Sequence, residues 1–320
     1  MSEIASAVER TRKAFASVSR LEEALARAPS DRSLQLNLSA MRKLALQSQE
    51  QLFEFSKRVH VEVCNYRLVP EATDGYALAY VSASMLEYQN LFSQIYDAKR
   101  NGAKTRAVIG KDALQESALE FGYSYAGSLG MVLLRPGSRD MISGTFDDSI
   151  NALYQVMDIK DQHDVRDVAH NLGNAVVKRL HDWSDANLKG GFAADVRWTR
   201  SDGHQLGEMI ERKRMEHIVG IIDATSDQQV KEIEVIGVLW GGDLGSGSFH
   251  FIVPNGDDYR GHFAEEFRGD TEMILGKRYQ ARIREKSTVT YSTEKVERER
   301  DLISLSEPPK SFISKDTSKS

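Results

Sequence analysis

The stretch from residue 232 to residue 263, EIEVIGVLWGGDLGSGSFHFIVPNGDDYRGHF, contains three short runs rich in β-branched and aromatic residues. A glycine-rich segment at 241–247 and an Asn-Gly pair at 255–256 separate these runs. Runs of this composition between turn residues are typical of strands that are joined as hairpins. The stretch therefore predicts three consecutive strands of an antiparallel sheet.

Two more strands are predicted downstream, in LGKRYQARIREK at 275–286 and in RERDLISL at 298–305, after a short helix at 264–274. Three strands, a helix and two strands form the element order of a small five-stranded OB-like β-barrel. An SH3-like barrel is the alternative, because element order alone does not fix strand pairing. Together with a helix predicted at 208–222, this barrel forms the domain expected at 204–306.

Basic residues alternate along the fourth predicted strand of the barrel. Because successive side chains of a strand point to opposite faces, four cations share one face: Arg278, Arg282, Arg284 and Lys286. Such a row can bind a phosphate backbone or an acidic protein surface. In the alternative interpretation, carboxylates near the next strand neutralise the row through cross-strand pairs. The candidates for this neutralisation are Glu294, Glu297, Glu299 and Asp301.

The first three strands also carry aromatic residues that could stack on nucleic-acid bases. These residues are Trp240, Phe249, Phe251 and Tyr259. Phe249 and Phe251 occupy the same face of a short strand, which favours a place in the barrel core. The glycine-rich segment at 241–247 precedes a strand rather than a helix, so it predicts a hairpin turn and not a phosphate-binding loop.

The middle of the chain, residues 60–203, predicts a mixed α+β domain. Strands are predicted from alternating apolar residues at 60–69, 119–125, 131–134 and 192–199. Helices are predicted at 74–100, behind a capping box at 145–148, and at 164–188, with a polar connector at 103–116. The fold class expected for the whole chain is therefore α+β.

One group of ionisable residues lies at the start of the long helix predicted at 164–188. His163, Asp167 and His170 share the side opposite the apolar face, and they fall on adjacent helical turns. Imidazole and carboxylate groups suit a zinc or manganese ion, which could activate water for hydrolysis. The alternative is the solvated face of an amphipathic helix, favoured because no further ligand can be assigned. We therefore assign no metal and no cofactor.

Residues 1–59 predict two long helices that form a coiled-coil-like hairpin. Apolar residues recur at intervals of three or four on both sides of a break at Pro29 and Ser30, which places one narrow apolar seam on each helix. Some apolar residues fall outside this seam and need a second surface: Leu36, Leu44, Leu46 and Phe53. We therefore expect a homo-oligomer, or a partner protein, to pack on this hairpin.

Composition limits the classes of protein that remain. The chain has 320 residues, of which 41% are hydrophobic and 28% charged, and its net charge of −5 provides no long-range attraction for nucleic acid. A single cysteine, Cys64, excludes an intrachain disulfide. We expect a cytoplasmic protein without membrane contact, because the sequence lacks a signal peptide and an apolar run of about 20 residues. Residues 307–320 have the composition of a disordered tail.

These patterns favour a non-catalytic binding or assembly protein over an enzyme. The expected protein oligomerises through its N-terminal hairpin and binds nucleic acid or an acidic protein on its C-terminal barrel. Two alternatives remain open. One is a metal-dependent hydrolase or nuclease that uses His163, Asp167 and His170, and the other is a purely structural protein-protein adaptor.

Overall fold

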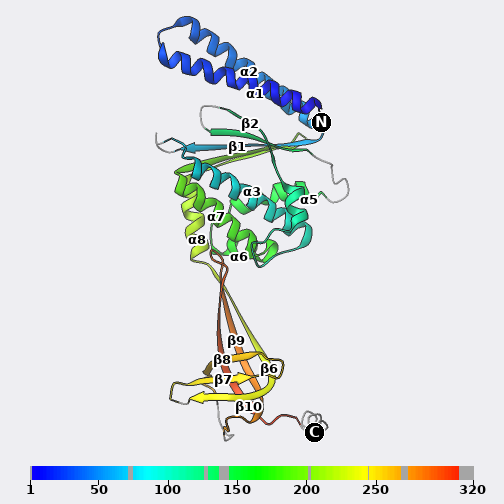
Figure 1. Cartoon of the computed structure of the whole chain (residues 1–320), viewed down its shortest axis with the longest axis vertical. Coiled ribbons are helices and arrows are strands. Elements are labelled where there is room, and N and C mark those ends of the chain that lie inside the picture. The colour runs from blue at the N-terminus through cyan, green and yellow to red at the C-terminus, as the bar shows by residue number, and fades with distance from the viewer. Residues whose placement is uncertain are drawn as a thin grey trace. The chain divides into compact units, whose positions relative to one another are not determined.

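The computed structural model of the chain describes residues 2–70, 75–125, 129–136, 144–200, 203–243, 245–267 and 273–309. Within these residues it has eight helices and ten strands, so the predicted mixed α+β class is confirmed. The chain divides into two compact units, Met1–Thr225 and Ser226–Ser320 (Figure 1). This division lies at a different position from the boundary predicted at 203, and the predicted domain limits stay predictions. No helix of the described part has the length and hydropathy that a membrane span requires.

The first unit begins with helices α1 (Ser2–Arg27) and α2 (Arg32–Arg58), which pack against each other. Asp31 caps the second helix, since its carboxylate accepts hydrogen bonds from the backbone N–H groups of Ser33 and Leu34 at 2.8 and 3.1 Å. Val18, Leu38 and Ala45 are buried between the helices. The predicted N-terminal helical region is therefore confirmed, with its apolar seam in the interior.

A five-stranded sheet follows, in the order β2-β3-β1-β4-β5, and all of its neighbouring strands are antiparallel. Its strands are β1 (Val61–Pro70), β2 (Glu120–Tyr125), β3 (Leu129–Pro136), β4 (Phe192–Thr199) and β5 (Gln205–Ile210). The helix predicted from residue 208 is wrong in its first part. Ile210 is buried and pairs with Ala194, so β5 continues to that residue and helix α8 (Arg212–Asp223) begins only after it.

Helices of the first unit cover one face of this sheet, opposite the α1/α2 hairpin (Figure 1). They are α3 (Leu78–Asn101), α5 (Thr145–Met157), α6 (Gln162–Leu172) and α7 (Asn174–Gly190), together with α8. Trp198 stacks on Phe92 of α3 with 5.2 Å between ring centroids, and Trp183 of α7 donates a hydrogen bond to the Tyr66 hydroxyl at 3.0 Å. Cys64 is buried in the same core, and burial raises the pKa of its thiol to about 12.

The helix predicted over 164–188 is in fact two helices, because the chain breaks at Gly173. This glycine has a φ of +94°, which side-chain-bearing residues rarely adopt. A Cβ atom at Gly173 would also lie 2.3 Å from the carbonyl oxygen of Lys104. The close approach of the Lys104 backbone therefore separates α6 from α7, and residues on the two helices do not share one continuous face.

The polar connector predicted at 103–116 contains a further helix, α4 (Lys111–Ser117). The hydroxyl of its last residue, Ser117, lies 2.7 Å from both of its hydrogen-bond partners, the hydroxyl of Ser93 and the carbonyl oxygen of Ala113. Long-range contact with α3 thus holds a short helix that local sequence alone does not predict.

The second unit contains a closed five-stranded barrel, as predicted, and its strand order is β10-β8-β7-β6-β9. Its strands are β6 (Ser226–Asp243), β7 (Ser248–Ile252), β8 (Asp258–Phe263), β9 (Arg278–Thr290) and β10 (Lys295–Ser306). Strands β8 and β10 are parallel, with Asp301 opposite His262, and the other neighbours are antiparallel. Of the helix predicted at 264–274, residues 268–272 lie outside the described residues, whereas 264–267 form a turn and 273–274 are not helical, so the prediction is wrong in its described part.

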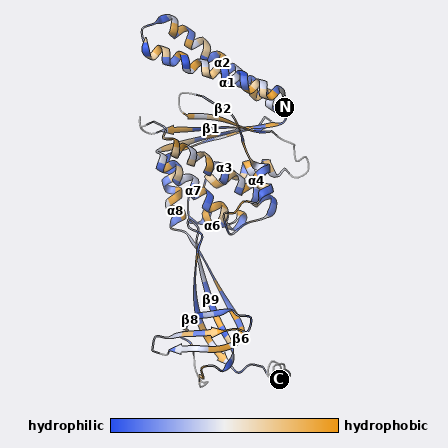
Figure 2. Cartoon of the chain, viewed as in Figure 1, coloured by the Kyte–Doolittle hydropathy of each residue, from blue (hydrophilic) through white to orange (hydrophobic). Residues whose placement is uncertain are grey.

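Three strands of the barrel continue well beyond its apolar core. Ser226 of β6 pairs with Thr290 of β9, and Thr290 pairs in turn with Lys295 of β10. We call this extension, residues 226–232, 284–290 and 295–301, the ribbon. Hydrophilic residues dominate the ribbon, whereas hydrophobic residues gather in the barrel (Figure 2).

Candidate ligand-binding face of the barrel

The basic row of β9 lies on the outside of the barrel, because the residues that alternate with it fill the core. Tyr279, Ala281 and Ile283 are completely buried. Arg278 and Arg282 are exposed, and Arg284 and Lys286 are partly exposed. The row therefore runs along one outward face of β9, from the barrel into the ribbon.

Carboxylates of the same chain lie beside three cations of this row. Nitrogen and carboxylate oxygen are 3.7 Å apart for Arg282 and Glu232, 2.5 Å for Arg284 and Glu266, and 3.4 Å for Lys286 and Glu299. The Arg284 pair is the closest. The pKa of Glu266 is lowered mainly by a hydrogen bond from its own backbone N–H and next by the hydrogen bond from Arg284. Of the four carboxylates proposed from sequence, Glu299 pairs with the row.

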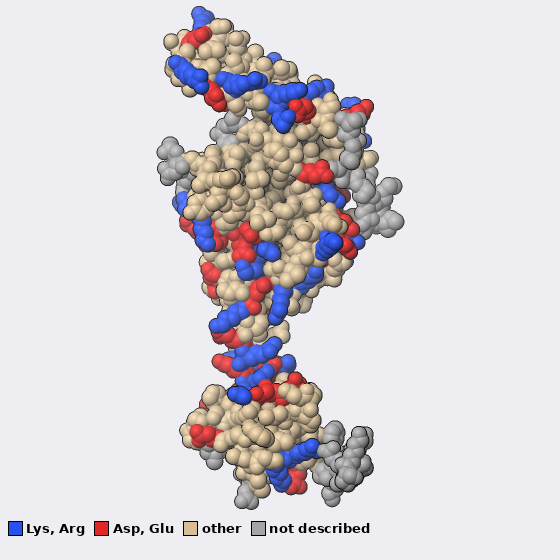
Figure 3. Space-filling model, in the orientation of Figure 1, with Lys and Arg blue, Asp and Glu red and all other residues tan. Residues whose placement is uncertain are grey.

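Lysine, arginine, aspartate and glutamate side chains intermingle along the ribbon on the face shown in Figure 3, rather than forming a uniform basic stripe. The paired cations keep 34–47% of their side-chain surface exposed. Exposed pairs of this kind contribute little to stability, because water screens them. An anionic ligand would therefore have to displace these carboxylates, at a modest cost per pair.

A second outward feature lies on β6, where the ladder with β7 has a bulge between Leu239 and Gly241. Leu239 points into the core, and Trp240 is 64% exposed. A bulge of this kind re-aims a side chain at the surface of a sheet. By contrast, Phe249 and Phe251 are buried in the core as predicted.

One polar residue, His250, lies on the strand next to Trp240, and a second, Arg260, lies one strand farther. Gly241 pairs with His250 of β7, and His250 pairs with Arg260 of β8. Asp258 holds both side chains, since its carboxylate oxygens lie 2.8 Å from His250 Nε2 and 3.0 Å from Arg260 Nη2. The hydrogen bond from Arg260, more than the charge of His250, keeps the pKa of Asp258 below its usual value. We call Trp240, His250, Asp258 and Arg260 the Trp240 face.

Sequence reasoning identified Trp240 as a candidate but missed His250 and Arg260. A signal for them existed in the alternation of β7, because His250 stands between two core phenylalanines and must therefore point outward. Arg260 follows from the register of the β7–β8 hairpin, which places it opposite His250. The fourth aromatic candidate, Tyr259, packs against the core, and the guanidinium of Arg300 lies 4.9 Å from its ring centroid.

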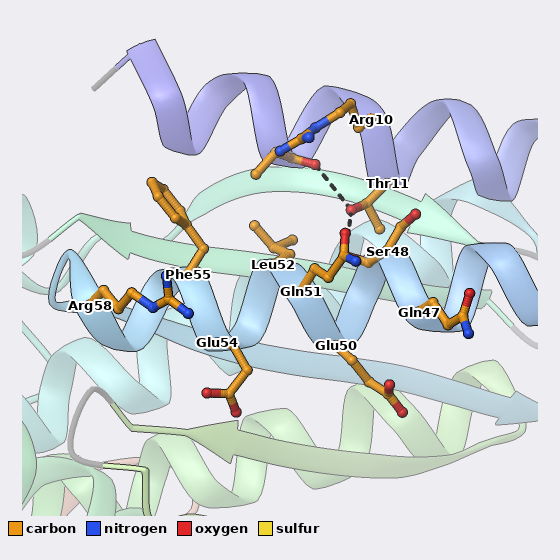
Figure 4. A pocket seen from close by; sticks show the side chains of 11 residues that line it. Arg10, Thr11, Gln47, Ser48, Glu50, Gln51, Leu52, Glu54, Phe55 and Arg58 are labelled. Atoms are coloured by element: carbon orange, nitrogen blue, oxygen red, sulfur yellow. Dashed lines mark hydrogen bonds between the residues drawn. The ribbon is translucent and has the colours of Figure 1, made fainter.

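A separate groove of 690 Å³ lies between α1 and α2 of the first unit (Figure 4). Ala7, Thr11 and Leu52 line its buried part, and the Thr11 hydroxyl donates to the backbone oxygens of Ala7 and Ser48. Charged side chains of both signs surround it: Arg10, Glu50, Glu54 and Arg58. On the α2 surface, Leu36, Leu44 and Leu46 are 50–65% exposed.

The histidine and aspartate candidates lie on the exposed surface of α6. His163 Nδ1 is 3.1 Å from Asp167 Oδ2, and their side chains are 80% and 61% exposed. His170 is also exposed. Among the residues that the structure describes, no group of three His, Cys, Asp or Glu side chains is arranged to hold a metal ion. The hydrolase alternative therefore rests on the sequence pattern alone.

Comparison with known proteins gives no relative for this chain: no protein-family model, no curated protein and no solved structure matches it.

Proposed function

We propose that the protein is a non-catalytic binding and assembly protein, and that its barrel is OB-like and binds single-stranded nucleic acid. The OB-like assignment is supported by strand order. Strand β9 returns to lie beside β6, so that β9-β6-β7-β8 is a Greek key, and β10 closes the barrel. OB-type Greek-key barrels bind oligonucleotides on the face of their second and third strands, which here are β7 and β8.

The observation that carries this proposal is the exposed indole of Trp240 on β6, with His250 on the neighbouring strand and Arg260 one strand farther. Bases stack on exposed aromatic rings without strong sequence preference, and nearby guanidinium groups contribute to single-strand binding surfaces of this kind. The row of Arg278, Arg282, Arg284 and Lys286 begins next to this face, because Arg278 pairs with Val238 on β6. In this proposal, bases stack on the Trp240 face, and the backbone phosphates contact the row. An acidic protein could use the row but has no need of the indole.

Replacement of Trp240 by alanine is expected to weaken binding of a single strand of about 15 thymidines by about tenfold, because stacking contributes about 1–3 kcal/mol per base. Fluorescence anisotropy of a labelled strand measures this change. Phe121→Ala is the matched control, because Phe121 is also an exposed aromatic residue, at 60%, but lies in the first unit. In the unmodified protein, binding of the strand should quench the fluorescence of Trp240 alone, because Trp183 and Trp198 are completely buried.

Two further arms of this titration separate the alternatives. Arg282→Glu combined with Arg284→Glu should lower both the affinity and its dependence on salt, because phosphate contacts release counterions. Unchanged affinity in both the Trp240 and the double arginine variants would overturn the nucleic-acid proposal. Tight binding of poly-glutamate, with an affinity that Trp240→Ala does not change, would instead identify an acidic protein as the partner.

The assembly part of the proposal rests on the α1/α2 hairpin. Leu36, Leu44 and Leu46 of α2 are 50–65% exposed, and a second copy of the same hairpin could bury them. We expect Leu36→Lys combined with Leu44→Lys and Leu46→Lys to convert an oligomer to monomers in native mass spectrometry, without loss of folding. Leu78→Lys is the control, because Leu78 is 80% exposed on α3. A monomeric unmodified protein at all accessible concentrations would contradict self-assembly.

A further inference from the structure

One face of the five-stranded sheet is covered by the helical hairpin over only part of its area. Ala7 and Leu52 of the hairpin pack with Val63, Tyr123 and Val132 of the sheet. Farther along the same face, β1 and β4 carry polar and charged side chains instead. This polar part includes a carboxylate that is almost completely buried.

The buried carboxylate is that of Asp195, which is only 4% exposed. Arg67 Nη2 lies 2.8 Å from one of its oxygens, and Arg197 Nε lies 2.9 Å from the other. The two arginine side chains are themselves 40% and 65% exposed. Asp195 therefore positions two guanidinium groups at the surface, while the three side chains together keep a net positive charge.

A second polar pair lies beside this triad. The Tyr125 hydroxyl donates a hydrogen bond to Asn65 Oδ1 at 2.5 Å, and Asn65 pairs directly with Arg197 across β1 and β4. The oxygens of Asp195 and Asn65 thus accept hydrogen bonds inside the group. Because guanidinium and amide nitrogens have more protons than these contacts use, the group has an excess of donors.

Two glycines allow these side chains to lie flat on the sheet. A Cβ atom at Gly207 of β5 would be 3.1 Å from Arg197 Cγ, and one at Gly130 of β3 would be 2.1 Å from Tyr125 Cζ. The ring of Tyr125 also packs on Phe15 of α1, with 5.3 Å between centroids. All five strands thus contribute to the arrangement, by a functional group or by the absence of a side chain.

We propose that Asn65, Arg67 and Arg197, positioned by Tyr125 and Asp195, bind a phosphate group. Guanidinium groups contact phosphate oxygens through two parallel N–H donors, and an adjacent carboxylate that fixes their orientation reduces the entropy lost on binding. The exposure of Arg197 gives access to a phosphate attached to a larger molecule as well as to inorganic phosphate. This site lies in the first unit and does not depend on nucleic-acid binding by the barrel.

Thermal unfolding followed by tryptophan fluorescence in a Trp240→Phe background tests this proposal, because the remaining tryptophans, Trp183 and Trp198, both lie in the first unit. Inorganic phosphate and phosphoserine are each compared with chloride at equal ionic strength. A ligand that binds only the folded state at about ten times its Kd should raise the melting temperature by about 3 °C. A rise with both probes indicates recognition of phosphate alone, and a larger rise with phosphoserine indicates a phosphate monoester.

Arg197→Met is expected to abolish this rise, because it removes one of the two guanidinium groups. The sheet should stay intact, because Arg67 remains to pair with Asp195. Arg197→Lys should restore only part of it, since lysine keeps the charge without the planar fork. Arg42→Met is the matched control, because Arg42 pairs with Glu22 at 2.7 Å on the hairpin and is 57% exposed. An equal rise in Arg197→Met, or no rise with either probe in the unmodified protein, would overturn the proposal.

Discussion

Gly261→Ala is expected to destabilise the barrel by about 3 kcal/mol or more, while the first unit stays folded. Gly261 lies on β8, where this strand runs beside β10. A Cβ atom there would be 2.0 Å from the carbonyl oxygen of Arg300 and 2.9 Å from its Cβ. Because a backbone oxygen of a paired strand cannot move away without breaking the ladder, the added methyl group must separate β8 from β10.

Hydrogen exchange measured by mass spectrometry on the full chain gives a local readout of this effect. Amides of β8 and β10 should lose protection in Gly261→Ala, and amides of β1 and β4 should keep it. Gly242→Ala is the control, because a Cβ at Gly242 would meet Phe263 at an ordinary 3.5 Å. Unchanged protection of β8 and β10 in Gly261→Ala would show that the barrel does not close through this pairing.

Asp97→Ala is expected to destabilise the first unit by about 3 kcal/mol, because it removes one partner of a buried ion pair. The side chain of Asp97 is completely buried and pairs with Lys104. It also accepts hydrogen bonds from Asn101 Nδ2 at 2.6 Å and from the backbone N–H of Gly110 at 2.8 Å. The carboxylate of Asp97 thus holds the segment between α3 and α4, residues 102–110, against the core.

Urea unfolding followed by tryptophan fluorescence in a Trp240→Phe background, where only Trp183 and Trp198 of the first unit remain, measures the loss in Asp97→Ala. Asp185→Ala is the matched control, since Asp185 also pairs with a lysine, Lys189 at 2.6 Å, but at the surface. That variant should change stability by less than about 1 kcal/mol. Similar losses in the two variants would contradict the role assigned to burial.

The same carboxylate predicts how acid affects the first unit. Burial opposes the charged form of Asp97, but the hydrogen bonds from Lys104, Asn101 and Gly110 outweigh it and lower the pKa below the usual 3.8. A group with a lowered folded-state pKa stabilises the protein above its unfolded pKa and loses that contribution as pH falls through the folded value. The difference in stability between the unmodified protein and Asp97→Ala should therefore narrow as the pH falls below about 4.

The alternation of buried and outward side chains along β9 was predictable from sequence, because the face of a strand residue follows from its position along the strand alone. The partners of the row were only partly predictable. Glu299 lies on the following strand, β10, but Glu232 and Glu266 reach the row from β6 and from the turn after β8. Long-range pairing therefore decides whether a basic strand is neutralised.

The break at Gly173 illustrates a second limit of sequence reasoning. A glycine within an otherwise helical pattern is tolerated at a cost of about 1 kcal/mol, so the pattern alone favours one continuous helix. The deciding contact is with the backbone of Lys104, which lies about 70 residues earlier in the chain and is invisible to helical periodicity. The Asp195 site was missed for a similar reason, because Arg67 and Arg197 meet only through the pairing of β1 with β4.

The position of β10 between β8 and β9 has a consequence for how the second unit folds. Until β10 has been synthesised, β8 and β9 each keep one unpaired edge. Core residues such as Phe251 and Ile283 are then not fully covered. Closing contacts that join such distant segments is slow compared with helix formation. The barrel therefore cannot close until its last strand has been synthesised, and until then its open edges and exposed core are prone to aggregation.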